Sequence, residues 1–363
     1  MPGPRCLPRA APRSPPHGRI SLRPGRTCRT SAPRRRRSDV ADVTLIEAVR
    51  LAALQEMRRD PRVWVLGEDV ARGGLFGQYG GFVEEFGPQR VVSTPISEST
   101  IMGAGLGAAL VGTRPIIEMR IFDFVMCAMD ELVNQIAKIR YMFGGQAKPA
   151  VVVRMPHGIW RNSAAQHSQT LESWFTHIPG VVVAVPATPA DAAGLLVSAI
   201  RSDDPVLFFD PKNLFPRRGA LADIIAPLPF GQARKIRDGK DLTIVSWSAA
   251  VPIVEEAVET LAARGISADA MDLRTLWPWD EDAVCASAAR TGRLLVVHEA
   301  VTTGGFGGEV VARVVERLGP GALRRVARLG QPRVPVPFAP PLEDALKPDA
   351  AKVVAAAESL LRD

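Results

Sequence analysis

The sequence has few cysteines, and none of them is spaced as a disulfide or metal motif requires. Cys6, Cys28, Cys127 and Cys285 are the four cysteines in 363 residues, and no two form a Cys-x-x-Cys pair. A disulfide framework or a thiolate metal site needs cysteines in pairs at short spacing. The sequence therefore predicts neither, and it indicates a reducing compartment.

Long hydrophobic runs are also missing. No apolar stretch reaches the roughly 18 to 20 residues of a membrane-spanning helix, because Arg, Asp, Glu or Pro interrupts each of them. Apolar residues make up 47%, aromatic residues 6% and charged residues 23% of the chain, as in ordinary globular proteins. We expect no membrane partner, and a chain of this length can form two α/β domains with proper cores.

Acidic residues are absent from the first 38 positions, which hold eleven arginines and no lysine. Without this segment the chain has 34 basic and 38 acidic residues, so its net charge of +7 becomes mildly negative. A nucleic-acid-binding protein would keep a basic excess in its folded part, and we expect no nucleic-acid partner. The many prolines exclude a continuous helix, so we interpret residues 1–38 as a disordered extension or a leader.

The compartment depends on what this segment is. An Arg-rich, acid-free segment is also a feature of mitochondrial transit peptides, which would place the protein in the matrix. A dispensable tail, or a start codon assigned too far upstream, fits the proline content better. We therefore expect a bacterial cytoplasmic protein, with the mitochondrial matrix as the alternative.

Short apolar strands alternate with helical patterns along the rest of the chain. The segments AVVVRMP, GVVVAVP and PVLFFD are apolar almost throughout, which is typical of parallel strands covered by helices on both faces. Residues 122–143 are predicted to form one long helix. The alternation stops in a proline-rich stretch and then resumes. We therefore predict two α/β domains with parallel sheets, over residues 39–213 and 241–363, joined by a linker over 214–240.

Several long segments point to a known family. They read VVSTPISESTIMGAGLGAAL, PIIEMRIFDFVMCAMDELVNQIAKIRYMFGG and AAQHSQTLESWFTHIPGVVVAVPATPADAAGLL, accompanied by LGEDVARGGLF and MDLRTLWPWDEDAV. Together they resemble the β subunit of the thiamine-diphosphate-dependent decarboxylase component of 2-oxo acid dehydrogenase complexes, of the pyruvate, branched-chain or acetoin type. The resemblance covers residues 43–363. It implies a transketolase-like pyrimidine-binding domain followed by a transketolase C-terminal domain.

The resemblance implies a catalytic role for Glu98, in TPISE. In the family, a carboxyl group at this position bonds nitrogen 1′ of the cofactor's aminopyrimidine ring. That bond drives the ring to its imino form, which then deprotonates the thiazolium, a form of general acid–base catalysis. From the residues alone, a helix-start acid is the favoured interpretation of Glu98, because Ser97 and Ser99 flank it as capping residues do.

Three further positions match residues of the family's site. Phe124 in FDF matches the aromatic that packs on the pyrimidine ring, although a core role is the alternative, and Phe122 is expected in the core. His167 in AAQHSQ matches the histidine that lines the substrate channel and handles protons, with a hydrogen-bonded loop histidine as the alternative. Glu68 matches an acid that supports the cofactor pocket, with Asp69 as the fallback and a loop acid as the alternative.

The sequence lacks the Gly-Asp-Gly segment with which single-chain thiamine enzymes hold magnesium and diphosphate. The resemblance implies that an α subunit supplies that part of the site, in an α2β2 heterotetramer. The implied reaction is oxidative decarboxylation of a 2-oxo acid, with acyl transfer to a lipoyl-bearing acyltransferase core. The implied cofactor is thiamine diphosphate shared with the α subunit, which would hold the magnesium.

A structural potassium ion, held partly by backbone oxygens, is also implied by the resemblance. Ser202 and Asp204 replace an acid and an amide common in the family, so the ion stays an open prediction. The matching positions here are Val151, Ala199, Ile200, Ser202 and Asp204.

Other interpretations remain. The pattern Gly103-x-Gly105-x-x-Ala108 fits a dinucleotide-binding loop, but a helix start rather than a strand precedes it, and small residues there also permit close packing. Ten-residue spacing of His157, His167 and His177 fits no common short spacing of zinc ligands.

The alternative functions are an acetoin dehydrogenase β subunit and a catalytically silent scaffold that binds the α chain. A silent chain would be expected to lack Glu98, Phe124 or His167, and all three are present. The segments FFDPKNLF and LRTLWPWDEDAV resemble the branched-chain type, whereas AAQHSQTLESWF and VPATPADAAGLL resemble the pyruvate or acetoin type. The sequence therefore leaves the substrate open.

Deleting residues 1–38 is expected to leave assembly and activity unchanged, because the predicted domains begin after them. Size-exclusion chromatography with the partner subunit and a turnover assay would check this. A large loss of either property would show that the segment is more than a leader or an extension.

Overall fold

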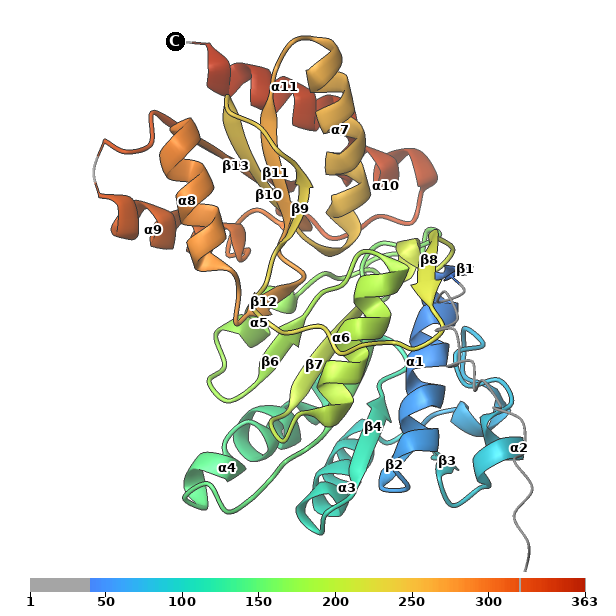
Figure 1. The fold of residues 1–363 in the computed structure, drawn as a ribbon. Helices are drawn as coiled ribbons and strands as arrows, with labels where there is room; N and C mark the ends of the chain where they lie inside the picture. Colours follow the sequence, from blue (N-terminus) through green and yellow to red (C-terminus); the bar gives the residue numbers. More distant parts are fainter. Residues whose placement is uncertain (1–39, 320, 363) are drawn as a thin grey trace, which may run out of the picture. The chain divides into compact units, whose positions relative to one another are not determined.

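The computed structural model describes residues 40–319 and 321–362, so the predicted extension lies outside the described residues. Within these ranges no helix is long and apolar enough to cross a membrane. Figure 1 shows two large sheets, each flanked by helices. The predicted fold class, two α/β domains with mainly parallel sheets, is confirmed.

The first sheet contains seven of the described strands, in the order β12-β6-β7-β5-β4-β2-β3, and only β12 is antiparallel to its neighbour. Successive side chains of a strand face opposite sides, so Val152 joins one core cluster and Val153 the other. This explains why the strands are apolar throughout. The strands are β2 (Val63–Gly67), β3 (Val91–Ser93), β4 (Arg114–Glu118), β5 (Val152–His157), β6 (Val182–Ala184), β7 (Val206–Pro211) and β12 (Thr275–Trp277).

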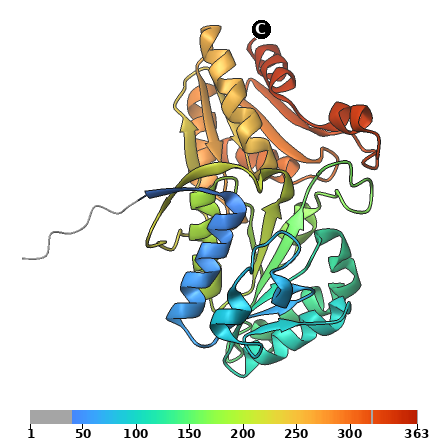
Figure 2. The ribbon, with the colours of Figure 1, turned by 90° about the vertical axis from the view of Figure 1, so that its right-hand side faces the viewer.

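Helices cover both faces of this sheet. On one face α1 (Leu45–Arg59) packs against α6 (Pro189–Arg201), as Figures 1 and 2 both show. Thr44 caps α1, since its hydroxyl accepts from the Glu47 amide (3.3 Å) and Glu47 Oε2 accepts from the Thr44 amide (2.8 Å). The other face carries α3 (Glu98–Leu110). Shorter helices are α2 (Phe82–Phe86), α4 (Ile139–Met142) and α5 (Glu172–Thr176), with 3-10 turns η1 (Val70–Arg72) and η4 (Lys212–Leu214).

The second sheet has the order β14-β13-β10-β11-β9 in the described residues, with β9 antiparallel at its edge. Helices α7 and α11 lie side by side on one face, and α8 and α9 pack together on the other. The strands are β9 (Arg234–Arg237), β10 (Leu242–Ser246), β11 (Ala268–Asp272), β13 (Arg293–Val301) and β14 (Arg325–Gln331). The helices are η5 (Ser248–Ala250), α7 (Val251–Ala263), α8 (Glu281–Thr291), α9 (Gly307–Leu318), α10 (Pro340–Leu346) and α11 (Ala350–Leu361).

The predicted linker over 214–240 contains two strands. β8 (Arg218–Ala222) pairs with β1 (Val40–Thr44), and β9 forms the edge of the second sheet. The predicted second domain also contributes a strand to the first sheet, because β12 belongs to that domain and pairs with β6 of the first. A short strand whose pairing partner lies far away in the sequence shows little hydrophobic periodicity of its own.

The single long helix predicted over 122–143 is wrong in detail. The chain forms a 3-10 helix, η2 (Phe122–Ala128), then a π-helix, η3 (Glu131–Ile136), and then α4. Phe122, Val125 and Ala128 are buried at intervals of three residues, the period of a 3-10 helix rather than an α-helix. Irregular helical turns of this kind are frequent at functional sites.

A buried ionic cluster lies near the carboxyl ends of the central strands. Arg154 on β5 is fully buried, and its Nη1 donates to Glu118 Oε2 (2.9 Å) while its Nε donates to Asp210 Oδ2 (2.9 Å). Tyr79 and Gln78, which lie in the loop between η1 and α2, also donate to Glu118 (2.6 and 3.1 Å). Burial raises the pKa of Glu118 and of Asp210, and the charge of Arg154 opposes both shifts. The guanidinium therefore ties β4, β5 and β7 together.

Replacing Arg154 with Met should lower the free energy of unfolding by about 3–5 kcal/mol, because it leaves buried carboxylates without their counter-charge. Denaturant unfolding of the full chain measures the loss. The matched control is Arg58→Met, which removes an exposed guanidinium 2.5 Å from Glu85; it should unfold like the wild type, as surface ion pairs contribute little. Equal effects of the two substitutions would contradict the role of the cluster.

Candidate active site

The four predicted site residues all follow carboxyl ends of neighbouring parallel strands. Glu68 comes directly after β2, Glu98 begins the helix after β3, Phe124 lies in η2 after β4, and His167 lies in the loop after β5. Carboxyl ends of parallel strands meet at one edge of the sheet, where such folds commonly bind ligands. The strand order β5-β4-β2-β3 makes these strands adjacent.

Two carboxylates and a guanidinium lie together at this edge. Glu68 is close enough to Glu98 for the charge of Glu98 to raise the pKa of Glu68, in addition to the larger effect of burial. The Arg120 guanidinium opposes this shift from 3.6 Å, and it also pairs with Asp69 (2.9 Å). Like charges held close in a partly desolvated place favour the protonated form of one partner. The arrangement can therefore hold a proton near Glu68 and Glu98.

Phe124 and His167 are brought together from segments about 40 residues apart. Their ring centroids are 5.3 Å apart with the planes at 89°, an edge-to-face contact. Phe124 remains 38% exposed, so the rest of its ring is free to contact another group. Phe122 is fully buried and packs on Phe175 and Phe209, which confirms its predicted place in the core.

The two pairs are linked through the start of α3. Ser99, next to Glu98, donates its hydroxyl to the Cys127 carbonyl of η2 (2.9 Å) and to Glu131 Oε2 (3.1 Å). The helix that begins with Glu98 is thereby fixed against the 3-10 helix that carries Phe124.

Sequence reasoning missed the residues that hold the histidine loop. Lys212 is buried, and its Nζ donates to the His167 carbonyl at 2.5 Å. Asp123, the neighbour of Phe124, accepts from both the amide and the side chain of Gln169 (3.2 and 2.9 Å). Burial lowers the pKa of Lys212, and the charge of Asp123 opposes that shift. Lys212 directly follows β7, so the rule that pointed to Glu68 could also have found it.

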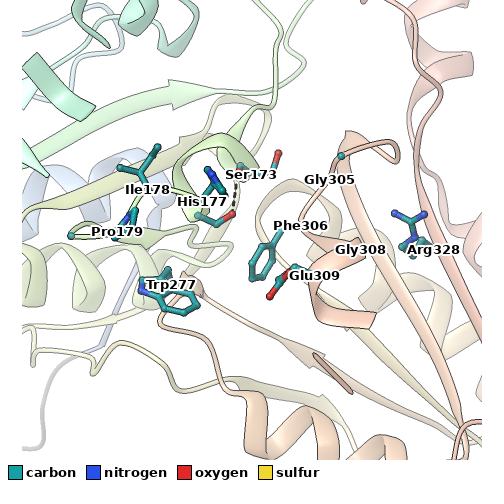
Figure 3. Close-up of a pocket in the computed structure, with 13 residues that line it drawn as sticks. Ser173, His177, Ile178, Pro179, Trp277, Gly305, Phe306, Gly308, Glu309 and Arg328 are labelled. Atoms are coloured by element: carbon teal, nitrogen blue, oxygen red, sulfur yellow. Dashed lines mark hydrogen bonds between the residues drawn. The ribbon is translucent and has the colours of Figure 1, made fainter. Parts of the chain in front are cut away.

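A cavity of about 700 Å³ lies elsewhere, and it contains none of the four predicted residues. Figure 3 shows Ser173, His177 and Pro179 on one side of this cavity and the loop from Gly305 to Glu309 on the other. Of the predicted site residues, Phe124 is exposed, and Glu68, Glu98 and His167 are half-buried.

The segment expected to hold potassium has cationic partners of its own. The carbonyl oxygens of Ile200 and Ser202 accept from Arg114 Nη1 (3.1 and 2.6 Å), and Asp203 pairs with Arg114 Nη2 (2.5 Å). A carbonyl oxygen has two lone pairs, so these bonds leave one position free on each oxygen. Potassium at this segment stays a prediction.

Comparison with known proteins assigns the two halves of the chain. The family model "Transketolase, pyrimidine binding domain" matches residues 41–218, and "Transketolase, C-terminal domain" matches residues 231–353. Over 327 residues the chain is 44% identical to the beta subunit of acetoin:2,6-dichlorophenolindophenol oxidoreductase of Cupriavidus necator, covering 87% of this chain and 96% of that protein. The chain belongs to the family of β subunits of thiamine-dependent 2-oxo acid and acetoin dehydrogenases.

Other members of the family are similar to nearly the same extent. The 2-oxoisovalerate dehydrogenase subunit beta of Bacillus subtilis is 40% identical over 88% of this chain and 98% of its own length. The pyruvate dehydrogenase E1 component subunit beta of Rickettsia felis is 38% identical over the same shares. Among solved structures, an inactive beta4 tetramer of a split-gene transketolase superposes with a TM-score of 0.71 at 24% identity, over 88% of this chain and 98% of that one. This last likeness shows the fold.

The family implies thiamine diphosphate, and the residues at the sheet edge fit one end of it. The carboxylates of Glu68 and Glu98 can bond a ring nitrogen, and the exposed part of Phe124 can pack on a flat ring. Within residues 40–319 and 321–362, no three His, Cys, Asp or Glu side chains are grouped as a metal ion requires.

Proposed function

We propose that the chain supplies the aminopyrimidine half of a thiamine diphosphate site in a 2-oxo acid dehydrogenase. The reaction is oxidative decarboxylation of a 2-oxo acid, with transfer of the acyl group to the lipoyl arm of an acyltransferase core. The observation that carries this proposal is the meeting, at one edge of the first sheet, of the Glu68–Glu98 pair with the Phe124–His167 pair.

When bound, thiamine diphosphate would supply a nucleophilic carbon that adds to the 2-oxo group and a cationic ring that accepts the electron pair left by the departing carbon dioxide. Glu98 bonds nitrogen 1′ of the aminopyrimidine ring and exchanges a proton there. Glu68 is the neighbouring acid, and burial and the charge of Glu98 raise its pKa, so it can take up or return a proton beside Glu98. Arg120 orients Glu68 by its ion pair.

Phe124 and His167 contact each other edge to face, and each has a separate role in the reaction. The exposed part of the Phe124 ring packs on the pyrimidine and excludes water from its face. His167, whose carbonyl is fixed by Lys212, presents its imidazole to the substrate and moves protons during acyl transfer. The contact between the rings sets the distance between the cofactor face and the proton-transfer group.

The other half of the site comes from an α subunit, which holds the magnesium and the diphosphate, in an α2β2 heterotetramer. Two observations support this. The sequence has no Gly-Asp-Gly segment, and the relatives carry the name subunit beta. The exposed part of Phe124 leaves an open face at which a second chain can complete the pocket.

Pyruvate or a branched-chain 2-oxo acid is the proposed substrate. The 44% identity to an acetoin oxidoreductase β subunit supports acetoin as a second candidate. The relatives named for pyruvate and 2-oxoisovalerate follow at 38% and 40%, so assays with all three substrates are needed to separate them.

Glu98→Gln, assembled with its partner subunit, should lose roughly 100-fold or more of the decarboxylation rate, because an amide cannot exchange the proton. Circular dichroism and co-elution with the partner should stay unchanged. Turnover is measured by carbon dioxide release with each candidate substrate.

The matched control is Glu281→Gln. Glu281 begins α8 as Glu98 begins α3, so both substitutions remove one acid from a helix start, but only Glu98 lies at the sheet edge. The control should turn over like the wild type. Wild-type turnover of the Glu98 variant would refute its proposed role.

A further inference from the structure

A carboxylate from the second domain reaches the loop that carries His167. Glu299 lies near the end of β13 and is 7% exposed. Its Oε1 accepts from the Ile159 amide (3.1 Å) and from the Thr170 hydroxyl (2.9 Å). Ile159 and Thr170 stand at the two ends of the loop, so a single oxygen atom joins both ends to β13.

The backbone approaches this carboxylate as closely as only glycine permits. A Cβ atom at Gly158 would lie 2.4 Å from Glu299 Oε1, and Gly158 has a φ of +86°. A side chain at this position would displace the carboxylate. The start of the loop is thus shaped around Glu299.

The second oxygen of Glu299 faces the segment that fixes His167 itself. Asn213 Nδ2 lies 3.5 Å from Oε2. The neighbouring Lys212, whose Nζ donates to the His167 carbonyl, lies close enough for the charge of Glu299 to oppose the lowering of its pKa by burial. Glu299 therefore bonds the loop near its two ends, and Lys212 bonds it at His167.

We propose that Glu299 is a positioning residue, which holds the loop from Gly158 to Thr170 against the C-terminal domain and thereby sets the position of His167. The proposal rests on the role of His167 given above. No described interaction joins Glu299 to Phe124 or Glu98, so Glu299 acts on the site through the loop that carries His167.

The charge of this carboxylate is poised to change near neutral pH. Burial and, to a lesser extent, the charge of Glu172 on α5 raise the pKa of Glu299 to about 7, against the bonds from Ile159 and Thr170 and the charge of Lys212. On its own strand the neighbouring titratable group is His298, whose pKa burial lowers to about 4. His298 is therefore neutral near pH 7, and Glu172 and Lys212 are the facing groups that matter.

The direction of the pH effect follows from the raised pKa. Ionised Glu299 accepts charge-assisted bonds from Ile159 and Thr170, but burial outweighs them and raises its pKa to about 7. The held loop therefore binds the proton more tightly than a loop that opens to water. The loop should be held more firmly below about pH 7 than above it.

The test compares three variants of the full chain, assembled with the partner subunit. Glu299→Gln keeps the shape but not the charge, and Thr170→Val removes one donor while leaving the carboxylate in place. Asp272→Asn is the matched control, since Asp272 is also buried with a pKa raised to about 7 but pairs with Arg234. The Asp272 variant should keep the wild-type kinetics.

Glu299→Gln should lower kcat roughly 10- to 100-fold below pH 7, the scale of a misplaced catalytic group, with KM for thiamine diphosphate unchanged. The fall of kcat as the pH rises through 7 should be absent in this variant and present in Thr170→Val, whose loss should be smaller. Unchanged kcat, or the same loss at every pH in both variants, would overturn the proposal.

A second readout does not depend on turnover. Arg161 is exposed within the loop, so trypsin cleavage after it reports how firmly the loop is held, with mass spectrometry identifying the cut. Glu299→Gln should be cleaved several-fold faster than the wild type at pH 6.5, and Asp272→Asn should not. If the wild type shows no thiamine-dependent turnover, the proposed function fails while cleavage still decides whether Glu299 holds the loop; equal cleavage rates would refute that.

The pH dependence of the free energy of unfolding tests whether Glu299 takes up this proton. Because the pKa of folded Glu299 lies above its ordinary value, its contribution to stability is complete below about pH 4.5 and is lost as the pH rises through about 7. The wild type should therefore lose more stability between pH 5 and 8 than Glu299→Gln does. An identical pH dependence of the two would contradict titration of Glu299 in this range.

Discussion

The ion cluster around Arg154 is the interaction on which the rest of the site depends. Its guanidinium joins the carboxylates of Glu118 and Asp210, which lie at or next to the ends of β4 and β7. The chain runs from Glu118 to η2 and Phe124, and from Asp210 to Lys212, whose Nζ donates to the His167 carbonyl. A shift of one central strand would therefore move the aromatic and the histidine apart.

The second constraint is that the two domains share a core. One continuous hydrophobic cluster contains Phe175 of the first domain and Trp247 of the second, and the Trp247 indole donates to the buried Glu172 carboxylate (3.0 Å). β12 adds a strand from the second domain to the first sheet. The C-terminal domain thus packs directly against the domain that carries the candidate site. Glu299, a residue of the C-terminal domain, can therefore reach the loop that carries His167.

Local patterns in the sequence predicted much of this arrangement. The apolar strands follow from hydrophobic periodicity, and the core position of Phe122 was expected beside the more exposed Phe124. Glu68, Glu98, Phe124 and His167 were placed by the family's motifs, and the structure brings them to one edge because each follows a neighbouring strand.

What the sequence did not predict depends on contacts between distant segments. Thr170 and Glu299 are 129 positions apart, and no periodicity links them. Apolar residues recur at intervals of three in the sequence of η2, but they also fit the longer helical pattern over residues 122–143. β12 was missed because its partner, β6, belongs to the other domain. Such features follow from the fold, and they determine how the site is held.

The most direct measurement is a calorimetric titration of thiamine diphosphate, with magnesium, into this chain alone, into its partner α subunit alone, and into the assembled pair. A half-site requires binding only in the assembled pair, with one cofactor per β chain, and 2-oxo acid decarboxylation only in that sample. Equal binding by this chain alone would show that it holds a complete cofactor site, and would contradict the shared active site.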